Sequence, residues 1–148
     1  GYPLATQKIR CPCRIEIYPH PALIELLGAT YRLPYKTGNT GKYWPGRPLI
    51  ERRRLLFDTW ATIVGALDGV LDGSVTLLSL PSIDARGRSL KAFEDRLDAA
   101  VAAHVGAMAL DGRAQAFGDA TSAVWVPVGA GSLASLRPQT RHPACGPL

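Results

Sequence analysis

The sequence contains no run of eighteen apolar residues, which is about the shortest length expected of a transmembrane helix. Its first residues, Gly1 to Ala5, also lack the charged and apolar regions of a signal peptide. We therefore expect a soluble cytoplasmic protein with no membrane partner. A chain of 148 residues with 47% hydrophobic content can bury one core, which predicts one domain.

Cysteine and histidine are scarce, with three residues of each. Cys11 and Cys13 lie too close together to supply two zinc ligands without a second pair elsewhere, and Cys145 stands alone in a proline-rich tail. The histidines show no ligand-like spacing among themselves. This pattern argues against a Cys/His zinc site and favours reduced thiols without a special role.

Acidic residues are fewer than basic ones, 12 against 17, which gives a net charge of +5. The excess is concentrated in residues 36–54, where Glu51 is the only acid. Such a patch suits a polyanion such as nucleic acid, although many mildly basic proteins simply solvate their lysines. The bases of this stretch are Lys36, Lys42, Arg47, Arg52, Arg53 and Arg54.

Alternation of polar and β-branched residues predicts a strand over residues 14–18, which Pro19 ends. A short helix follows from His20 to Leu27, with Gly28 as its stop signal. Residues 29–47 are rich in turn formers and predict a long surface loop, in which Tyr43 and Trp44 either stack on bases or pin the loop.

A second helix is predicted from Pro48 to about Leu67, with core positions at helical spacing. These positions are Leu49, Leu56, Trp60, Ile63 and Leu67. The apolar run 75–80 fits either a strand or a buried connection.

A third helix is predicted over residues 90–110, with Ser89 as its N-cap. Its core stripe consists of Leu90, Phe93, Leu97, Val101 and Met108. A turn at Gly118–Asp119 and a final strand over 123–128 follow, before a Gly/Pro-rich tail.

Two carboxylates are candidates for a site, although single acids at the edge of a sheet are usually solvated. Glu16 lies between two isoleucines of the first strand, where a buried acid would need a partner or a metal. Asp98 lies beyond the reach of the helix dipole and at the edge of the core stripe. Glu94 and Asp95, by contrast, suit the start of a helix, and Asp95 has Lys91 one turn earlier.

An ordered series of short motifs resembles the DUF429 family over about residues 14–128. The series consists of Glu16-Ile17-Tyr18-Pro19-His20-Pro21, Tyr35-Lys36, Glu51-Arg52-Arg53, Leu97-Asp98-Ala99-Ala100, Gly112-Arg113, Gly118-Asp119 and Trp125-Val126-Pro127. The resemblance implies an α/β, RNase H-like fold: a mixed sheet flanked by helices, here incomplete at its N-terminal side. On this interpretation 1–13 is a leader, 14–128 the C-terminal portion of that domain and 129–148 a tail.

The same resemblance implies a metal-dependent nuclease acting on phosphodiester bonds. It places the acids of the active site on Glu16 and Asp98, which would hold Mg²⁺ or Mn²⁺, with Asp95 as a further candidate. The strands that carry the family's first aspartate should precede residue 14, so a second segment or a second copy of the chain would have to complete the sheet. Conserved bases fall on Lys36 and on Arg52 or Arg53.

On this hypothesis Lys36 and Arg53 bind the phosphate, while Lys42, Arg47 and Arg52 follow the nucleic-acid backbone without reading its sequence. The alternative is a module of the same fold that binds nucleic acid or protein without catalysis. A hydrolase of small phosphorylated molecules is a third interpretation, which a narrow pocket would favour.

Overall fold

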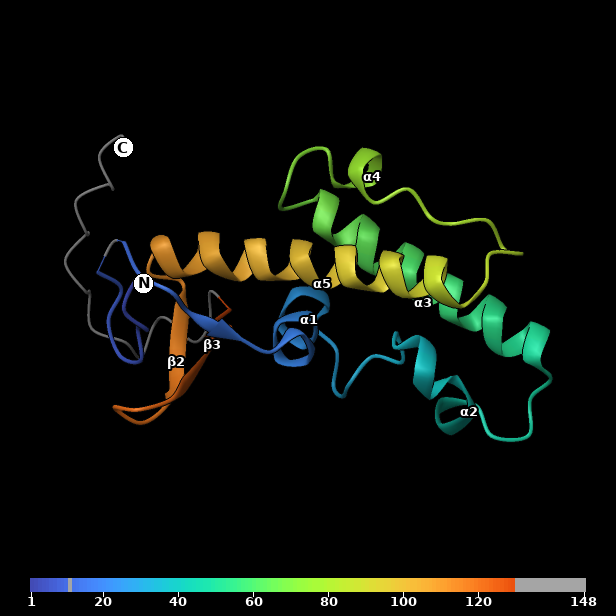
Figure 1. The fold of residues 1–148 in the computed structure, drawn as a ribbon, viewed down its shortest axis with the longest axis horizontal. Helices are drawn as coiled ribbons and strands as arrows, with labels where there is room; N and C mark the ends of the chain where they lie inside the picture. Colours follow the sequence, from blue (N-terminus) through green and yellow to red (C-terminus); the bar gives the residue numbers. More distant parts are fainter. Residues whose placement is uncertain (11, 130–148) are drawn as a thin grey trace.

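The chain forms a mixed α/β structure in which a small sheet lies at one end of a long helical layer (Figure 1). The structure is a computed structural model, and it describes residues 1–10 and 12–129. Cys11, Cys145 and nearly all of the predicted tail lie outside the described residues.

The sheet has three strands in the order β1-β3-β2: β1 (Glu16–Ile17), β2 (Ala114–Gly118) and β3 (Ala123–Pro127). β1 pairs in parallel with β3, and β2 pairs with β3 in antiparallel fashion. The central position suits β3, since its alternating Ala123, Trp125 and Pro127 are buried. This arrangement confirms the predicted α/β class with an open mixed sheet and flanking helices.

The segment that we interpreted as a leader contacts the domain. Ala5 and Arg14 are joined by a backbone hydrogen bond of 2.8 Å, and the indole N–H of Trp125 donates to the carbonyl oxygen of Ala5 at 2.7 Å. Ala5 and Ile9 are buried in the core. The first ten residues therefore contribute to the packing around the sheet.

Three helices carry most of the core: α1 (Pro19–Leu27), α3 (Leu49–Asp68) and α5 (Gly87–Leu110). α1 has proline in its first turn, where a missing N–H costs nothing, and it ends at Gly28 with a φ of 60°. Figure 1 shows α5 running past α1 and α3, and all three contact one another.

The buried stripes of α3 and α5 largely follow the predicted helical spacing. Trp60, Phe93 and Leu97 are fully buried, and Trp60 packs against the ring of Phe93, so this tryptophan is a core residue. Leu49 was wrongly predicted as core: it is 68% exposed, because the first turn of α3 extends beyond the helices that cover its later turns.

Other boundaries differ from the predictions. α5 begins at Gly87, not after Ser89, because the Ser89 N–H already bonds to the carbonyl oxygen of Arg86 within the first turn. The run 75–80 is not a strand: it overlaps the short helix α4 (Ser74–Leu77). It is buried only at Leu78, which joins the core, while Val75 and Leu77 are exposed.

Three elements were missed. The predicted loop 29–47 contains a 3₁₀ helix, η1 (Thr37–Asn39), and a single-turn helix, α2 (Thr40–Tyr43). Strand β2 was also missed, since Ala-Gln-Ala-Phe-Gly offers no β-branched residue and takes its structure from pairing with β3.

None of the helices in the described part of the chain combines the length and the apolarity needed to cross a membrane.

Leu97→Ala should lower the free energy of unfolding by about 2–5 kcal/mol, because the side chain is fully buried and its removal leaves a cavity. Leu110→Ala, on the same helix but 59% exposed, is the matched control and should change it little. Urea titration followed by tryptophan fluorescence measures both. Equal effects of the two substitutions would contradict this assignment of the core.

Candidate functional site

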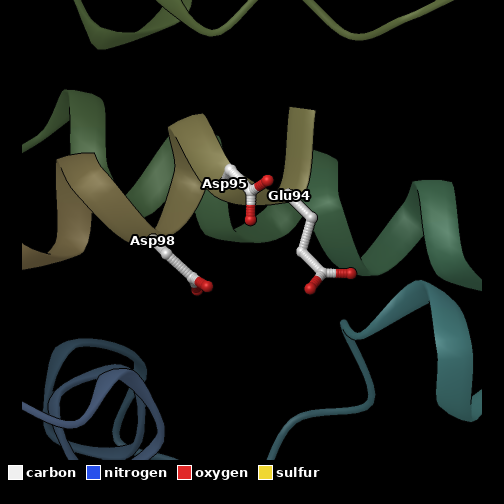
Figure 2. A group of neighbouring side chains, drawn as sticks. All are labelled: Glu94, Asp95 and Asp98. Atoms are coloured by element: carbon white, nitrogen blue, oxygen red, sulfur yellow. The ribbon is translucent and has the colours of Figure 1, made fainter. Parts of the chain in front are cut away.

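Three acids lie together in the N-terminal half of α5: Glu94, Asp95 and Asp98. One carboxylate oxygen of each lies within 4.8 Å of those of the other two. Figure 2 shows Glu94 and Asp98 extending from α5 toward the side on which α1 and the loop leading to α2 lie. We call these three residues the acidic group.

Glu94 is the most enclosed member, at 4% exposure. Its Oε2 accepts hydrogen bonds from both the backbone N–H and the hydroxyl of Thr37, each at 2.8 Å. Its Oε1 lies 3.1 Å from the Lys91 ammonium and 3.4 Å from the Lys36 ammonium. A buried carboxylate is thus fully provided with donors, as a buried charge requires.

Asp98 is partly buried and has two partners from adjacent residues. Its Oδ1 accepts a hydrogen bond of 2.8 Å from the Tyr35 hydroxyl, and its Oδ2 pairs with the Lys36 ammonium at 2.5 Å. Asp95 is exposed and pairs with Lys91, as the helical spacing predicted.

The segment Tyr35–Thr37 therefore binds α5 through three consecutive side chains, and we call it the anchoring segment. Tyr35 holds it in place, because its side chain is fully buried and its carbonyl oxygen accepts the indole N–H of Trp60 at 2.9 Å. The ring of His20 on α1 packs edge-on against Tyr35, with ring centroids 5.1 Å apart. α1, α3 and α5 all contribute to positioning this segment.

These surroundings perturb the titration of the buried groups. Burial alone would raise the pKa of Glu94, but the hydrogen bonds from Thr37 and Lys91 hold that pKa below its usual value. Burial and the hydrogen bond to Asp98 raise the pKa of Tyr35, so it stays a phenol that donates. Burial, together with the positive charges of Arg32 and Lys36, lowers the pKa of His20 to about 4.

Among the predicted acids, Asp98 and Asp95 belong to the acidic group, while Glu16 does not. Glu16 lies on β1 with its side chain exposed, although the neighbouring Ile15 and Ile17 are half-buried. The expectation that burial would force a partner on Glu16 was wrong, because its side of the short strand faces solvent. Its role as a metal ligand stays a prediction.

The predicted bases are divided between free and engaged side chains. Arg47 forms an ion pair with Glu51, and Arg53 donates to the carbonyl oxygen of Ala85. Lys42 on α2 is exposed. Arg52 is half-buried and, like Arg53, has a buried Nε without a hydrogen-bond partner.

These bases belong to α2, to the turn after it and to the first turns of α3. α2 contacts both α3 and η1, and η1 contacts α5 beside the acidic group. The basic stretch is therefore continuous with the anchoring segment. Its nearest base to the acids is Lys36, which binds two of them.

Sequence reasoning did not identify Glu94, Tyr35, Thr37 or His20 as parts of the site. Glu94 was explained by the helix dipole, although it directly follows Phe93 of the core stripe and lies one turn before Asp98. That spacing was the available signal. No comparable signal in the sequence indicates the hydrogen bonds between Thr37 and Glu94, since 57 residues separate these two residues.

A cavity of about 460 Å³ lies away from the acidic group. Leu26, His104, Met108 and Val128 are among the residues that line it, and no member of the acidic group does. This separation gives no support to the interpretation as a hydrolase with its acids inside a narrow pocket.

Fold and site together define a mixed α/β structure in which the anchoring segment contacts two of the three acids on α5, Glu94 and Asp98. The family model described as "Protein of unknown function (DUF429)" matches residues 5–122, and the chain belongs to this family. The match begins within the predicted leader and ends before β3. No curated protein and no solved structure matches the chain.

Glu94→Gln should lower the free energy of unfolding by about 2 kcal/mol, because an amide NH₂ would then face the Thr37 or the lysine donors. Asp95→Asn is the neighbouring exposed control and should leave it almost unchanged. Denaturant titration at pH 7 compares the two variants. Similar losses of unfolding free energy in the two variants would mean that the buried contacts of Glu94 stabilise the protein no more than the exposed ion pair of Asp95.

His20 should make the protein less stable in mild acid. Its pKa is about 4 in the folded chain against 6.5 in the unfolded one, so the unfolded state takes up the proton first as pH falls. The loss begins near pH 6.5, is complete below pH 4 and amounts to at most about 3 kcal/mol. In His20→Phe, unfolding free energies measured from pH 7 to pH 4 should fall less steeply than in the parent chain. Parallel pH curves would disprove this.

Proposed function

We propose that this DUF429 domain is a metal-dependent nuclease of the RNase H-like kind, with its metal site at the acidic group. The observation that carries the proposal is the approach of three carboxylates to within 4.8 Å on one turn of α5, beside a basic stretch. Oxygen donors of this kind suit Mg²⁺ or Mn²⁺. Asp98 is the principal ligand on this proposal, because it faces the anchoring segment like Glu94 but has two partners where Glu94 has four contacts.

The donor set fits a hard divalent cation in charge and in chemistry. When bound, the ion would polarise a phosphate oxygen and lower the pKa of a water molecule. Glu94 and Asp98 would hold it, while Glu16 remains a predicted further ligand on β1.

Residues around the acidic group would orient the metal ligand and bind the substrate. Tyr35 fixes the orientation of the Asp98 carboxylate through its hydrogen bond. Lys36 and Arg53 would bind the phosphate, and Lys42, Arg47 and Arg52 would bind the backbone of a polyanionic substrate. Because phosphate contacts carry no sequence information, we infer a substrate defined by its backbone.

A second candidate function is a binding module without catalysis. It is favoured by the surroundings of Glu94, which accepts three hydrogen bonds and forms an ion pair with Lys36. These contacts are also those of an acid whose role is structural. Such a module would bind nucleic acid through the same bases and would need no metal.

Incubation with end-labelled single-stranded and duplex DNA and RNA in Mn²⁺ separates the two functions. We expect cleavage that a chelator abolishes. Asp98→Asn should lower the rate by about 100-fold or more, since even the outer partners of metal ligands contribute 10–100-fold. Asp58→Asn, an equal charge change at an exposed position of α3, is the control and should cleave normally.

Fluorescence anisotropy with the same labelled substrates completes the experiment. Binding of nucleic acid without cleavage by the parent chain, unchanged in Asp98→Asn, would favour the binding module. Far-UV circular dichroism of both variants checks that each is folded.

A further inference from the structure

Lys36 already places a cation within the acidic group. Its ammonium lies 2.5 Å from Asp98 Oδ2, 3.4 Å from Glu94 Oε1 and 4.6 Å from the centroid of the Tyr35 ring. Two carboxylates and an aromatic face thus surround one positive charge. The aromatic face suits an ammonium, while the carboxylate oxygens are ligands that Mg²⁺ and Mn²⁺ also favour.

The oxygens of Glu94 have little capacity left for a metal while Lys36 is present, whereas each oxygen of Asp98 has one partner. Each oxygen offers about two lone pairs. Glu94 Oε2 accepts two hydrogen bonds from Thr37, while Glu94 Oε1 accepts one from Lys91 and forms an ion pair with Lys36 at 3.4 Å. A metal can therefore coordinate Glu94 and Asp98 together only if a lysine leaves.

Of the donors, Lys36 is the one that can leave the space between Glu94 and Asp98 without unfolding the loop. Tyr35 is fully buried, and Thr37 binds Glu94 partly through its backbone, so the main chain on both sides of Lys36 is fixed. The lysine side chain has a flexible four-carbon stem. Its ammonium can move while its Cα stays in place.

We propose that Lys36 is an exchangeable cation, which occupies the acidic group in the metal-free protein and moves to the substrate phosphate when Mg²⁺ or Mn²⁺ binds. This inference rests on the proposed metal site. It makes metal binding and phosphate binding cooperative, because the arriving ion releases a positive charge beside the place where the anion binds. Thermodynamic linkage requires the phosphate to strengthen metal binding by the same factor.

The first measurement is Mn²⁺ affinity by isothermal titration calorimetry of the full chain without nucleic acid. Lys36→Met should bind Mn²⁺ about tenfold more tightly or better than the parent chain, because the competing ammonium is gone. Lys8→Met makes the same charge change at an exposed site of the N-terminal segment and should alter the affinity less than about twofold. Equal affinities of Lys36→Met and the parent chain would overturn the proposal.

The second measurement follows the lysine itself in the unmodified protein and does not depend on a variant remaining well folded. The ¹⁵Nζ signal of Lys36, assigned by its absence in Lys36→Met, should shift to that of a solvated ammonium as Mg²⁺ saturates the protein. A signal unchanged at saturation would overturn the exchange.

Failure of the exchange and failure of the proposed function give different results. Cleavage of nucleic acid with Lys36 still bound to Asp98 contradicts only the exchange. Displacement of Lys36 by Mg²⁺ in a protein that cleaves no substrate contradicts only the nuclease. Absence of metal binding by both the parent chain and Lys36→Met overturns both.

Discussion

The contact between the anchoring segment and α5 is the constraint on which the site depends. Glu94 is a carboxylate held almost out of solvent, and such a charge is tolerable only when donors surround it. Thr37 and Lys36 from the anchoring segment supply three of those contacts, and Lys91 supplies the fourth. Separation of loop and helix would therefore remove three of the four contacts and leave Lys91 as the remaining partner of Glu94.

The hydrophobic core makes this contact possible. Tyr35 inserts between α1, α3 and α5, where the Trp60 indole binds its carbonyl oxygen and His20 packs against its ring. Its hydroxyl is then directed at Asp98. A single buried aromatic residue thus joins the packing of the helices to the orientation of an acid at the site.

The proposed chemistry and the stability of the domain use the same charges. Acids that bind a metal must be close together, and close acids repel each other unless cations intervene. In the structure Lys36 and Lys91 are those cations. The two ammoniums thus offset two of the three carboxylate charges, and on our proposal a divalent ion would replace one of them.

The candidate site was only partly predictable from the residues. Asp98 was identified because it lies beyond the helix dipole and at the edge of the apolar stripe, and Lys36 through the basic stretch and a family resemblance. Glu94 was passed over because an acid near the start of a helix has a local explanation. Glu16 was overestimated, since a two-residue strand with one solvent-facing side does not bury its carboxylate.

Local patterns in the sequence determined α1, α3, most of α5 and strand β3, because helical spacing, proline, glycine and β-branched residues act over a few neighbouring positions. Only the tertiary structure decided β2, the burial of Glu94 and the partners of Asp98. An alanine-rich strand forms because a partner strand lies beside it, and a carboxylate is buried because a loop some sixty residues earlier in the chain covers it. Such contacts leave no trace in the spacing of neighbouring residues, since they depend on where the chain returns in space.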